Sequence, residues 1–446
     1  MHQAHNLKVG GSNPSPATKI MISYIRKFYS DISQIEKISF SLFAFFPISL
    51  ILGNLAINLN LILIAFTFLI DLKIEKKLSF LKDKIFWLLI IFFLSLIPIL
   101  IFSVDHINSF PRVLKILLII PFILLIKKNI TNHEVQFEKR IFGIWSIVIL
   151  ITTLDVIFEI IFGYNIFGYS ANSLGYYGDI EGVIKGRIAS FFGEELVVGG
   201  FLGAFSLIGI GYLMKFHGKY KKIIIMSALV LITTSFLIGE RSNFIKFFIP
   251  ALIILFFFIK LNFKSKLTLS FLILLIIFIS YNFNTLSKNR YSYLVNLIVE
   301  KDAISNYLKK SQYGAHYDTA YSIFKDNKLF GVGLKNFRNE CSKEKYLNSE
   351  FERSKHRCAT HPHQIHFEIL SETGILGYLS FLVFIIISIY LSLRAYVEKK
   401  NIFQLMSILY VATFLIPMLP SGSFFSTFYS GLFWINYGIM VSYIKR

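Results

Sequence analysis

Residues 38–72 read ISFSLFAFFPISLILGNLAINLNLILIAFTFLIDL. A helix needs about 20 such apolar residues to cross the hydrocarbon core of a bilayer, so this run is either one long crossing or two short ones. Basic residues flank both ends, at Arg26, Lys27 and Lys37 and then at Lys73, Lys76, Lys77, Lys82 and Lys84. Because Lys and Arg favour the cytoplasmic side, both flanks are expected there, and the number of crossings must be even. The sequence therefore predicts two spans, over 38–55 and 57–72.

The composition extends this conclusion to the whole chain. Of 446 residues, 55% are hydrophobic and 16% are charged, whereas soluble domains carry about 25% charged residues. The net charge of +20 would suggest nucleic acid in a soluble protein. Here most basic residues lie in short loops between apolar runs, where membrane topology and anionic lipid headgroups explain them. We expect membrane lipid as a partner, and no nucleic acid.

The expected fold is all-α, a polytopic integral membrane protein with about twelve transmembrane helices. The candidate spans are 38–55, 57–72, 86–104, 113–126, 140–163, 191–214, 221–239, 243–261, 267–283, 374–394, 403–419 and 424–443. Helices 1–9 would occupy 38–283 and helices 10–12 would occupy 374–446, with a large periplasmic loop at 284–373. A shorter outside loop covers 164–190, and 1–37 is a cytoplasmic tail. Residues 1–20 lack a signal-peptide core, so they are a disordered tail or an extension upstream of a start at Met21.

Apart from those of the large loop, four basic residues fall on the outside and therefore break the topological rule: Arg112, Lys185, Arg187 and Arg241. Arg187 lies in GRIASFFGEEL (186–196), and Arg241 lies in GERSNF (239–244). A guanidinium keeps its charge and offers a planar fork of donors that suits phosphate, so these two arginines are candidates for holding a lipid-linked diphosphate. The alternative is local pairing, of Arg241 with Glu240 and of Arg187 with Glu194 or Asp179.

Three histidines occur in ATHPHQIHFEILSETGILG (359–377), at His361, His363 and His366. Proline is favoured at the first helical position, so Pro362 predicts His361 as the cap and His363 as the second helical residue. His363, His366, Leu370, Gly374 and Gly377 would then share one face, and the glycines would let a neighbouring helix approach. The positive end of the helix dipole disfavours imidazolium, which leaves His363 neutral and suited to act as a general base.

Two other interpretations of the histidines remain open. The first is a zinc triad of His361, His363 and His366, although the HExxH pattern is missing. The second is a simple capping or core role. Nearby, Cys341 and Cys358 are the only cysteines, and both fall in the predicted periplasmic loop, where a disulfide between them is plausible and two free thiols are the alternative.

Four motifs carry a family resemblance. His363-Gln364, nine residues and then Gly374-Ile375-Leu376-Gly377 resembles the His-[Asn/Ser/Gln]-x9-Gly-x-x-Gly signature of the O-antigen ligase family. FKDNKLFGVGLKNF (324–337) resembles a Pro-containing, Gly-rich element of that family, with Lys328 in place of the Pro. GERSNF and GRIASFFGEEL resemble two further elements, which places Arg241 and Arg187 on the family's arginines. The family often has another Arg before the Gly-rich element, and the nearest counterpart here is His316 or Asp318.

The resemblance implies metal-independent, inverting glycosyl transfer at the periplasmic face of the bacterial inner membrane, with no cofactor. The donor would be a glycan on undecaprenyl diphosphate, and the acceptor a hydroxyl of lipid A-core. His363 would be the base, Arg187 and Arg241 would bind the diphosphate, and His361, His366, Gln364 and His316 would support them. An O-antigen polymerase, which joins lipid-linked repeat units, is similar and stays open. A transporter or flippase is a third hypothesis, with Asp155, Glu159 and Glu194 or Glu195 as its main polar residues.

Overall fold

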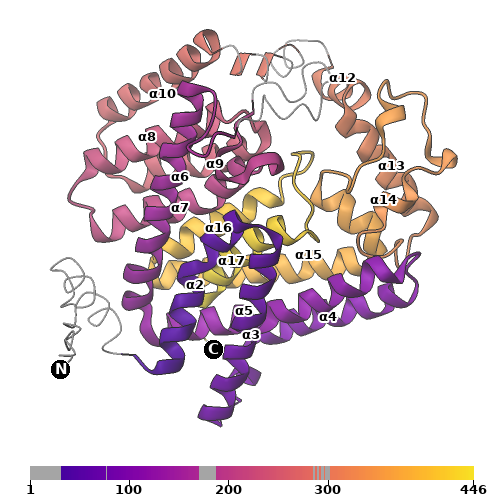
Figure 1. The fold of residues 1–446 in the computed structure, drawn as a ribbon, viewed down its shortest axis with the longest axis horizontal. Coiled ribbons are helices and arrows are strands. Elements are labelled where there is room, and N and C mark those ends of the chain that lie inside the picture. Colours follow the sequence, from indigo (N-terminus) through magenta and orange to yellow (C-terminus); the bar gives the residue numbers. More distant parts are fainter. Residues whose placement is uncertain are drawn as a thin grey trace, which may run out of the picture.

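The computed structural model describes residues 32–76, 78–169, 187–284 and 302–445, with 287, 288, 291, 292 and 296 between the last two ranges; of Glu194 it describes the backbone only. The described part is helical throughout and contains no strand (Figure 1). The expectation of an all-α fold is therefore confirmed. Residues 1–31 of the predicted tail 1–37, together with Lys185 and Asp179, lie outside the described residues.

Each of the twelve predicted spans contains a helix. These helices are α2 (Gln34–Leu52), α3 (Asn54–Glu75), α4 (Lys84–Ile101), α5 (His106–Phe137), α6 (Gly143–Phe162), α7 (Val198–Phe216), α8 (Lys221–Leu237), α9 (Arg241–Ile253), α10 (Phe263–Phe283), α15 (Ile365–Lys399), α16 (Ile402–Phe414) and α17 (Thr427–Ser442). In the described part, eight helical stretches are long and apolar enough to cross a membrane, with α5 and α6 counted as one stretch, His106–Phe162. The protein is a multi-pass membrane protein, and the number of twelve crossings stays a prediction.

The run 38–72 forms two helices, α2 and α3, that meet at Gly53. Gly53 has φ 96°, a conformation open mainly to glycine, and it ends one helix and starts the next. Asn60 of α3 donates a hydrogen bond to the carbonyl of Leu42 in α2 at 3.2 Å. The two helices therefore run back along each other, which agrees with two short passes rather than one long one.

The helix α5 differs from its predicted span, 113–126. It continues to Phe137 and joins α6 through the π-helical turn Glu138–Phe142, so Lys127 and Lys128 lie within a helix and not in a loop. Their ammonium groups form ion pairs instead, Lys127 with Asp83 at 2.7 Å and Lys128 with Asp71 and Glu75. Pairing with carboxylates on the preceding helices removes the need for a solvated loop.

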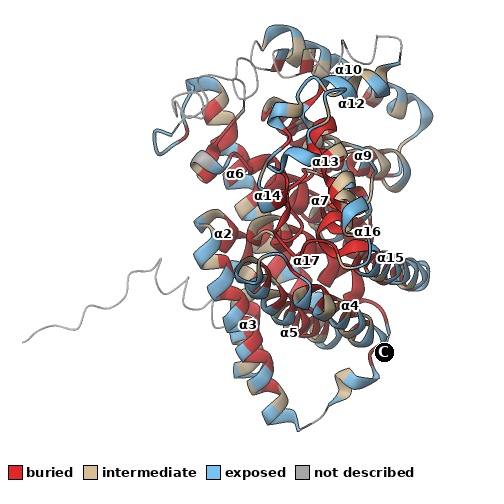
Figure 2. Ribbon diagram, turned by 90° about the vertical axis from the view of Figure 1, so that its right-hand side faces the viewer, coloured by how far each residue is buried: buried red, intermediate tan, exposed pale blue. Residues whose placement is uncertain are grey.

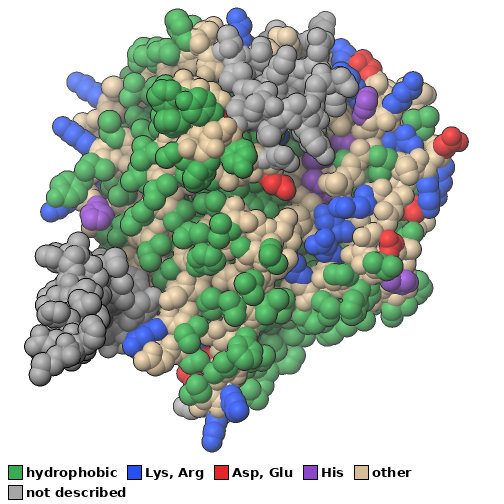
Figure 3. Space-filling view, viewed as in Figure 1, with side chains coloured by type: hydrophobic (Ala, Val, Ile, Leu, Met, Phe, Trp, Pro, Cys, Tyr) green, Lys and Arg blue, Asp and Glu red, His purple; other side chains and the backbone are tan. Residues whose placement is uncertain are grey.

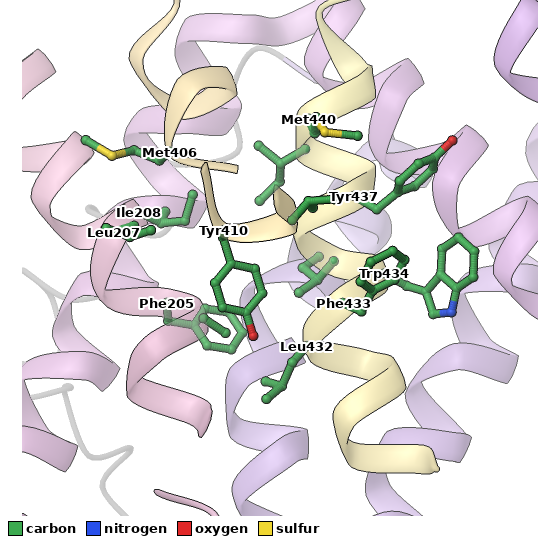
Figure 4. Packing of buried hydrophobic residues seen from close by; sticks show 14 of the residues in the cluster. Phe205, Leu207, Ile208, Met406, Tyr410, Leu432, Phe433, Trp434, Tyr437 and Met440 are labelled. Carbon is green, nitrogen blue, oxygen red and sulfur yellow. The ribbon is translucent and has the colours of Figure 1, made fainter. Parts of the chain in front are cut away.

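The core lies where α7 and α17 pass through the centre of the bundle. Both helices are buried over most of their length, whereas α10 exposes most of its apolar side chains (Figure 2). Figure 4 shows Phe205 of α7, Tyr410 of α16 and Trp434 of α17 in this core. Exposed apolar faces on the outer helices suit contact with lipid chains.

The large loop before α15 has its own small core. It contains α12 (Ala303–Lys310), α13 (Gln312–Asp326) and α14 (Phe337–Glu340), which lie beside the bundle at one end (Figure 1). The helix α13 ends at Asp326 and leads into a glycine-rich turn in which Gly331 and Gly333 both have positive φ. Ile323, Val332 and Phe337 are fully buried among these elements. The loop is therefore a folded unit that can hold side chains in fixed positions.

Candidate active site

The helix after the histidine stretch begins later than predicted. It starts at Ile365, and its cap is Gln364, whose side-chain oxygen accepts from the amides of His366 at 2.7 Å and Phe367 at 3.1 Å. His363 precedes the helix and has φ 56°. The predicted arrangement, with His361 as cap and His363 on a helical face with His366, is therefore wrong. The physical reason is tertiary: the amide of Ser421 holds the His363 carbonyl at 2.7 Å, which fixes His363 outside the helix.

Three imidazoles form a cluster around His363. Its ring centroid lies 4.1 Å from that of His361 and 5.2 Å from that of His316 on α13. His316 and His361 are buried, whereas His363 is partly exposed. The loop helix thus supplies His316, a histidine that the local sequence motif does not contain, to this cluster.

Hydrogen bonds distinguish the nitrogens of this cluster. Nε2 of His361 faces the Ser421 carbonyl at 3.3 Å and Nδ1 faces the Thr360 hydroxyl at 3.0 Å. Nδ1 of His316 faces the Arg357 carbonyl at 2.7 Å, so this nitrogen carries the proton, because a carbonyl only accepts. Neither ring nitrogen of His363 has a hydrogen-bond partner within the described ranges. His363 is therefore the member of the cluster with both ring nitrogens available to a ligand, whereas His316 has one engaged.

His366 lies apart from the cluster. Its Nε2 donates to the Leu415 carbonyl at 3.1 Å, and its Nδ1 accepts from the Tyr378 hydroxyl across 3.2 Å. His366 therefore ties α15 to the end of α16. Gln364 is buried and caps α15. His366 and Gln364 therefore support the backbone around His363, and their side chains make contacts outside the imidazole cluster. For the zinc hypothesis, no group of three His, Cys, Asp or Glu side chains arranged to hold a metal ion is found in the described part.

The histidines of the cluster are held neutral. Loss of hydration is the largest cause, and unfavourable electrostatic interaction with a protonated His316 and with Arg187 adds to it, so that the pKa of His363 is lowered to about 3. Burial lowers the pKa of His316 and, further, that of His361. The expected neutral state of His363 is therefore present, but its cause is burial and neighbouring positive charge and not the helix dipole.

Arg187 lies close enough to His363 for its charge to act on the imidazole. Its guanidinium donates to the Leu196 carbonyl at 2.7 Å and approaches Glu240 at 3.7 Å. Glu240 is the residue that the sequence suggested as a partner for Arg241, whereas the suggested partners of Arg187, the Asp179 residue and the Glu194 side chain, are not described. Arg241 opens α9 directly after Glu240. Through Glu240, the Arg187 guanidinium therefore lies next to the α8–α9 turn, where Arg241 begins α9.

A buried polar network next to the histidines was not predicted from the sequence. Glu368 accepts from the Phe424 amide at 2.7 Å and from the Ser423 hydroxyl. Lys335 donates to the same hydroxyl at 2.6 Å, and its amide donates to Glu372 at 2.6 Å. The network joins the glycine-rich turn, α15 and the α16–α17 loop. The sequence feature that could have indicated this network is the pair Glu368 and Glu372, one turn apart at the start of an apolar helix. Ionisable groups are costly there unless they have partners.

Cys341 and Cys358 are joined by a disulfide, with their Cα atoms 5.2 Å apart. Arg357, beside Cys358, provides the carbonyl that orients His316 and donates to the Ser342 carbonyl at 2.9 Å. The disulfide is therefore one residue away from a direct hydrogen-bond partner of His316.

A cavity of about 1420 Å³ lies elsewhere, between α5, α6, α7 and α8. Its lining is mostly apolar, with Lys139, Arg140 and Lys222 among the lining residues. None of the predicted site residues lines it, so it is separate from the histidine cluster.

Fold and site together define a multi-pass membrane protein in which a folded loop and the adjacent helix ends collect histidines and arginines (Figure 3). Residues 224–382 match the model of the O-antigen ligase family, so this part of the chain is similar to that family. The match contains Arg241, His316 and His363, whereas Arg187 precedes it. No curated protein matches the chain.

Proposed function

We propose that this protein is an O-antigen ligase of the bacterial inner membrane. It transfers a glycan from undecaprenyl diphosphate to a hydroxyl of lipid A-core, at the periplasmic face. The family match supports a lipid-linked glycan as substrate class. The same match is compatible with a polymerase, so the acceptor is the part of the proposal that needs the most direct test.

The observation that carries the proposal is the difference between His363 and its neighbours. His361 and His366 use both ring nitrogens in hydrogen bonds. His363 keeps both nitrogens available, is neutral, and feels the charge of Arg187. A neutral imidazole next to a guanidinium is the pair that glycosyl transfer from a diphosphate needs: a base for the acceptor and a cation for the leaving group.

The reaction would proceed as one displacement. His363 accepts the proton of the acceptor hydroxyl while the oxygen attacks the anomeric carbon of the glycan. The bond between that carbon and the diphosphate oxygen breaks, and undecaprenyl diphosphate leaves with the electron pair. Arg187 and Arg241 stabilise the negative charge that grows on the diphosphate, and the proton on His363 is released to solvent after product departure. Attack opposite the leaving group inverts the anomeric carbon, and the step requires no metal.

A deletion strain complemented with the gene tests the acceptor. Loss of the ligase leaves lipid A-core unmodified and lets lipid-linked polymer accumulate, and the complementing gene restores the polymer on the core. Core that carries a single repeat unit in the deletion strain would contradict the ligase and indicate a polymerase. For the transporter hypothesis, reconstituted vesicles would move a labelled glycolipid across the bilayer without joining it to an acceptor, a result that would overturn both enzyme assignments.

A further inference from the structure

A second group of cations, separate from Arg187 in the fold, lies near the histidine stretch. It consists of Arg112 and Lys115 on α5 and of Lys335 and Arg338 in the large loop, and it is named the α5 cation cluster below. Arg112 and Lys115 are three residues apart, so they share one face of α5. The charge of Arg112 acts on Lys115, and the charges of Arg338 and Glu372 act on Arg112. Arg112 is one of the cations that topology leaves unexplained.

Backbone contacts fix the cluster in place. The amide of Val104, before α5, donates to the Val332 carbonyl at 3.0 Å, and the Ser109 hydroxyl donates to the Leu334 carbonyl at 3.0 Å. Asn336 donates to the Ser103 hydroxyl at 2.8 Å. The start of α5 is thus docked on the glycine-rich turn. This docking holds four positive charges together, although like charges repel at short range.

The carboxylates nearby are already occupied. Glu372 accepts the amides of Lys335 and Phe337, and Glu368 accepts the Phe424 amide and the Ser423 hydroxyl. The Nζ atom of Lys115 is buried and has no hydrogen-bond partner among the residues that the structure describes. Arg112 likewise makes no hydrogen bond within the described ranges. A buried cation without a partner is costly, so the cluster is better explained as a site that an anion completes.

The cluster also reaches the catalytic segment. Arg338 donates to the Thr360 carbonyl at 3.4 Å, next to His361, and the charge of Lys335 acts on His361. Arg187 acts on His363 from a different part of the fold, the segment before α7. Two cationic groups from different parts of the fold therefore act on the histidine stretch, one on His361 and the other on His363. Figure 3 shows Lys and Arg side chains gathered beside His side chains on this face.

We propose that the α5 cation cluster binds a phosphoryl group of the lipid-borne acceptor, while Arg187 and Arg241 bind the diphosphate of the donor. The inference rests on the proposed function. A cation pair on one helix face and a guanidinium in the loop suit the oxygens of a phosphate monoester. Two separate anion sites would place acceptor and donor on opposite sides of His363, so that the acceptor hydroxyl meets the base and the anomeric carbon together.

Native mass spectrometry of the full-length protein in detergent tests this proposal. The protein is saturated with undecaprenyl diphosphate and then titrated with lipid A, which carries phosphates, or with the same lipid after enzymatic dephosphorylation. We expect the wild-type protein to bind one molecule of each lipid. Dephosphorylation should weaken the affinity for lipid A at least about tenfold. The double variant Arg112→Gln/Lys115→Gln should lose lipid A binding by a similar factor and keep undecaprenyl diphosphate. Arg187→Gln should show the opposite pattern, and Lys355→Gln, an exposed cation of the same loop, should match wild type.

The outcomes separate the inference from the proposed function. Lipid A binding that survives Arg112→Gln/Lys115→Gln, or that ignores dephosphorylation, would overturn the second site even if the ligase is active. If millimolar inorganic phosphate displaces lipid A, the cluster is an anion site that does not require a lipid. That result would contradict the assignment of the cluster to the acceptor. If the double variant does not fold, the single variants Arg112→Lys and Lys115→Arg serve instead. Both keep the charge and should retain lipid A binding within a few fold. Loss of lipid A binding in both variants would overturn a site based on charge.

Discussion

The amide of Ser421 donates a hydrogen bond to the carbonyl of His363 at 2.7 Å, and the Ser421 carbonyl accepts from His361 at 3.3 Å. One residue of the α16–α17 loop therefore holds both ends of the His361–His363 segment. This clamp explains why His363 adopts φ 56°, a conformation that side chains other than glycine rarely take without tertiary support. The position of His363 is created by contacts between distant segments, and not by the helix that follows.

The variant His363→Asn should fold and lose transfer. Asparagine tolerates a positive φ better than most residues, so the backbone clamp should remain, but an amide cannot accept the acceptor proton. We expect the rate to fall by about 10²–10⁴-fold, measured with purified protein, lipid-linked glycan and lipid A-core. The control is His356→Asn, an exposed histidine of the same loop, which should match wild type. Unchanged transfer by a folded His363→Asn would exclude His363 as the base.

The pH dependence of transfer should reveal the low pKa of His363. A base works in its neutral form, so activity falls only when the pH drops toward its pKa, which is about 3 in the free protein. The kcat/KM profile reports the free enzyme and should therefore stay flat down to about pH 5. A bound diphosphate offsets the charge of Arg187 and raises the pKa of His363, so the acid limb of kcat should lie at higher pH. Identical acid limbs in both profiles, near pH 6.5, would contradict this account.

Arg187→Lys and Arg241→Lys should both slow transfer while leaving the fold intact. A lysine keeps the positive charge but cannot offer two parallel donors to a diphosphate. We expect about a tenfold to hundredfold loss in kcat, less than the roughly 10²–10³-fold loss on removing one charge-stabilising contact altogether, because the lysine keeps the charge. Arg353→Lys, in an exposed part of the loop, is the matched control. Full activity of both variants would show that the donor diphosphate lies elsewhere.

The disulfide should stabilise the loop and, through it, the position of His316. Closing a loop of this size, with a separation of 17 residues, contributes about 3 kcal/mol in the chain-entropy view. Cys341→Ser/Cys358→Ser should therefore lower Tm and expose the loop to limited proteolysis. Transfer should fall as well, because Arg357 beside Cys358 orients His316. Wild type treated with a reductant should behave like the double variant, and a variant with unchanged Tm would mean that the bridge does not stabilise the fold.

The helices could be predicted from the sequence because their signals are local. Apolar runs and basic flanks located all twelve helical segments, including the pair α2 and α3 divided at Gly53. The ends were less predictable: α5 extends past Lys127 and Lys128 because carboxylates on α3 and before α4 pair with them. The rule that places basic residues in cytoplasmic loops cannot anticipate such pairs, since it depends on charge and not on contacts.

The site was predictable as a set of residues but not as a geometry. His363, His316 and Arg187 were named from motifs, and the structure brings them within range of each other. The motif could not reveal that Gln364 caps α15, because this depends on Ser421 holding the preceding residue. Nor could it reveal the network of Lys335, Glu368 and Ser423, whose members come from three distant segments.

Gly374 provides the last prediction. Both glycines of the α15 motif were expected to let a neighbouring helix approach, and at Gly377 a side chain would meet Ile99 of α4 at 2.9 Å. Gly374 instead has φ 63° and interrupts α15, where the amide of Ile375 donates to the Lys328 carbonyl at 2.8 Å. A Cβ at Gly374 would lie 2.4 Å from the Leu329 carbonyl oxygen, far inside contact distance.

Gly374→Ala should therefore push the glycine-rich turn away from α15 and destabilise the protein, through both the strained φ and the clash. We expect a loss of at least about 2 kcal/mol, seen as a lower Tm, together with loss of transfer, because the same turn carries Lys335. Gly203→Ala is the matched control: Gly203 lies within the helix α7, and its added Cβ would meet nothing closer than 3.7 Å. That variant should keep activity and Tm. Equal Tm values for Gly374→Ala and wild type would show that the turn is not held against α15.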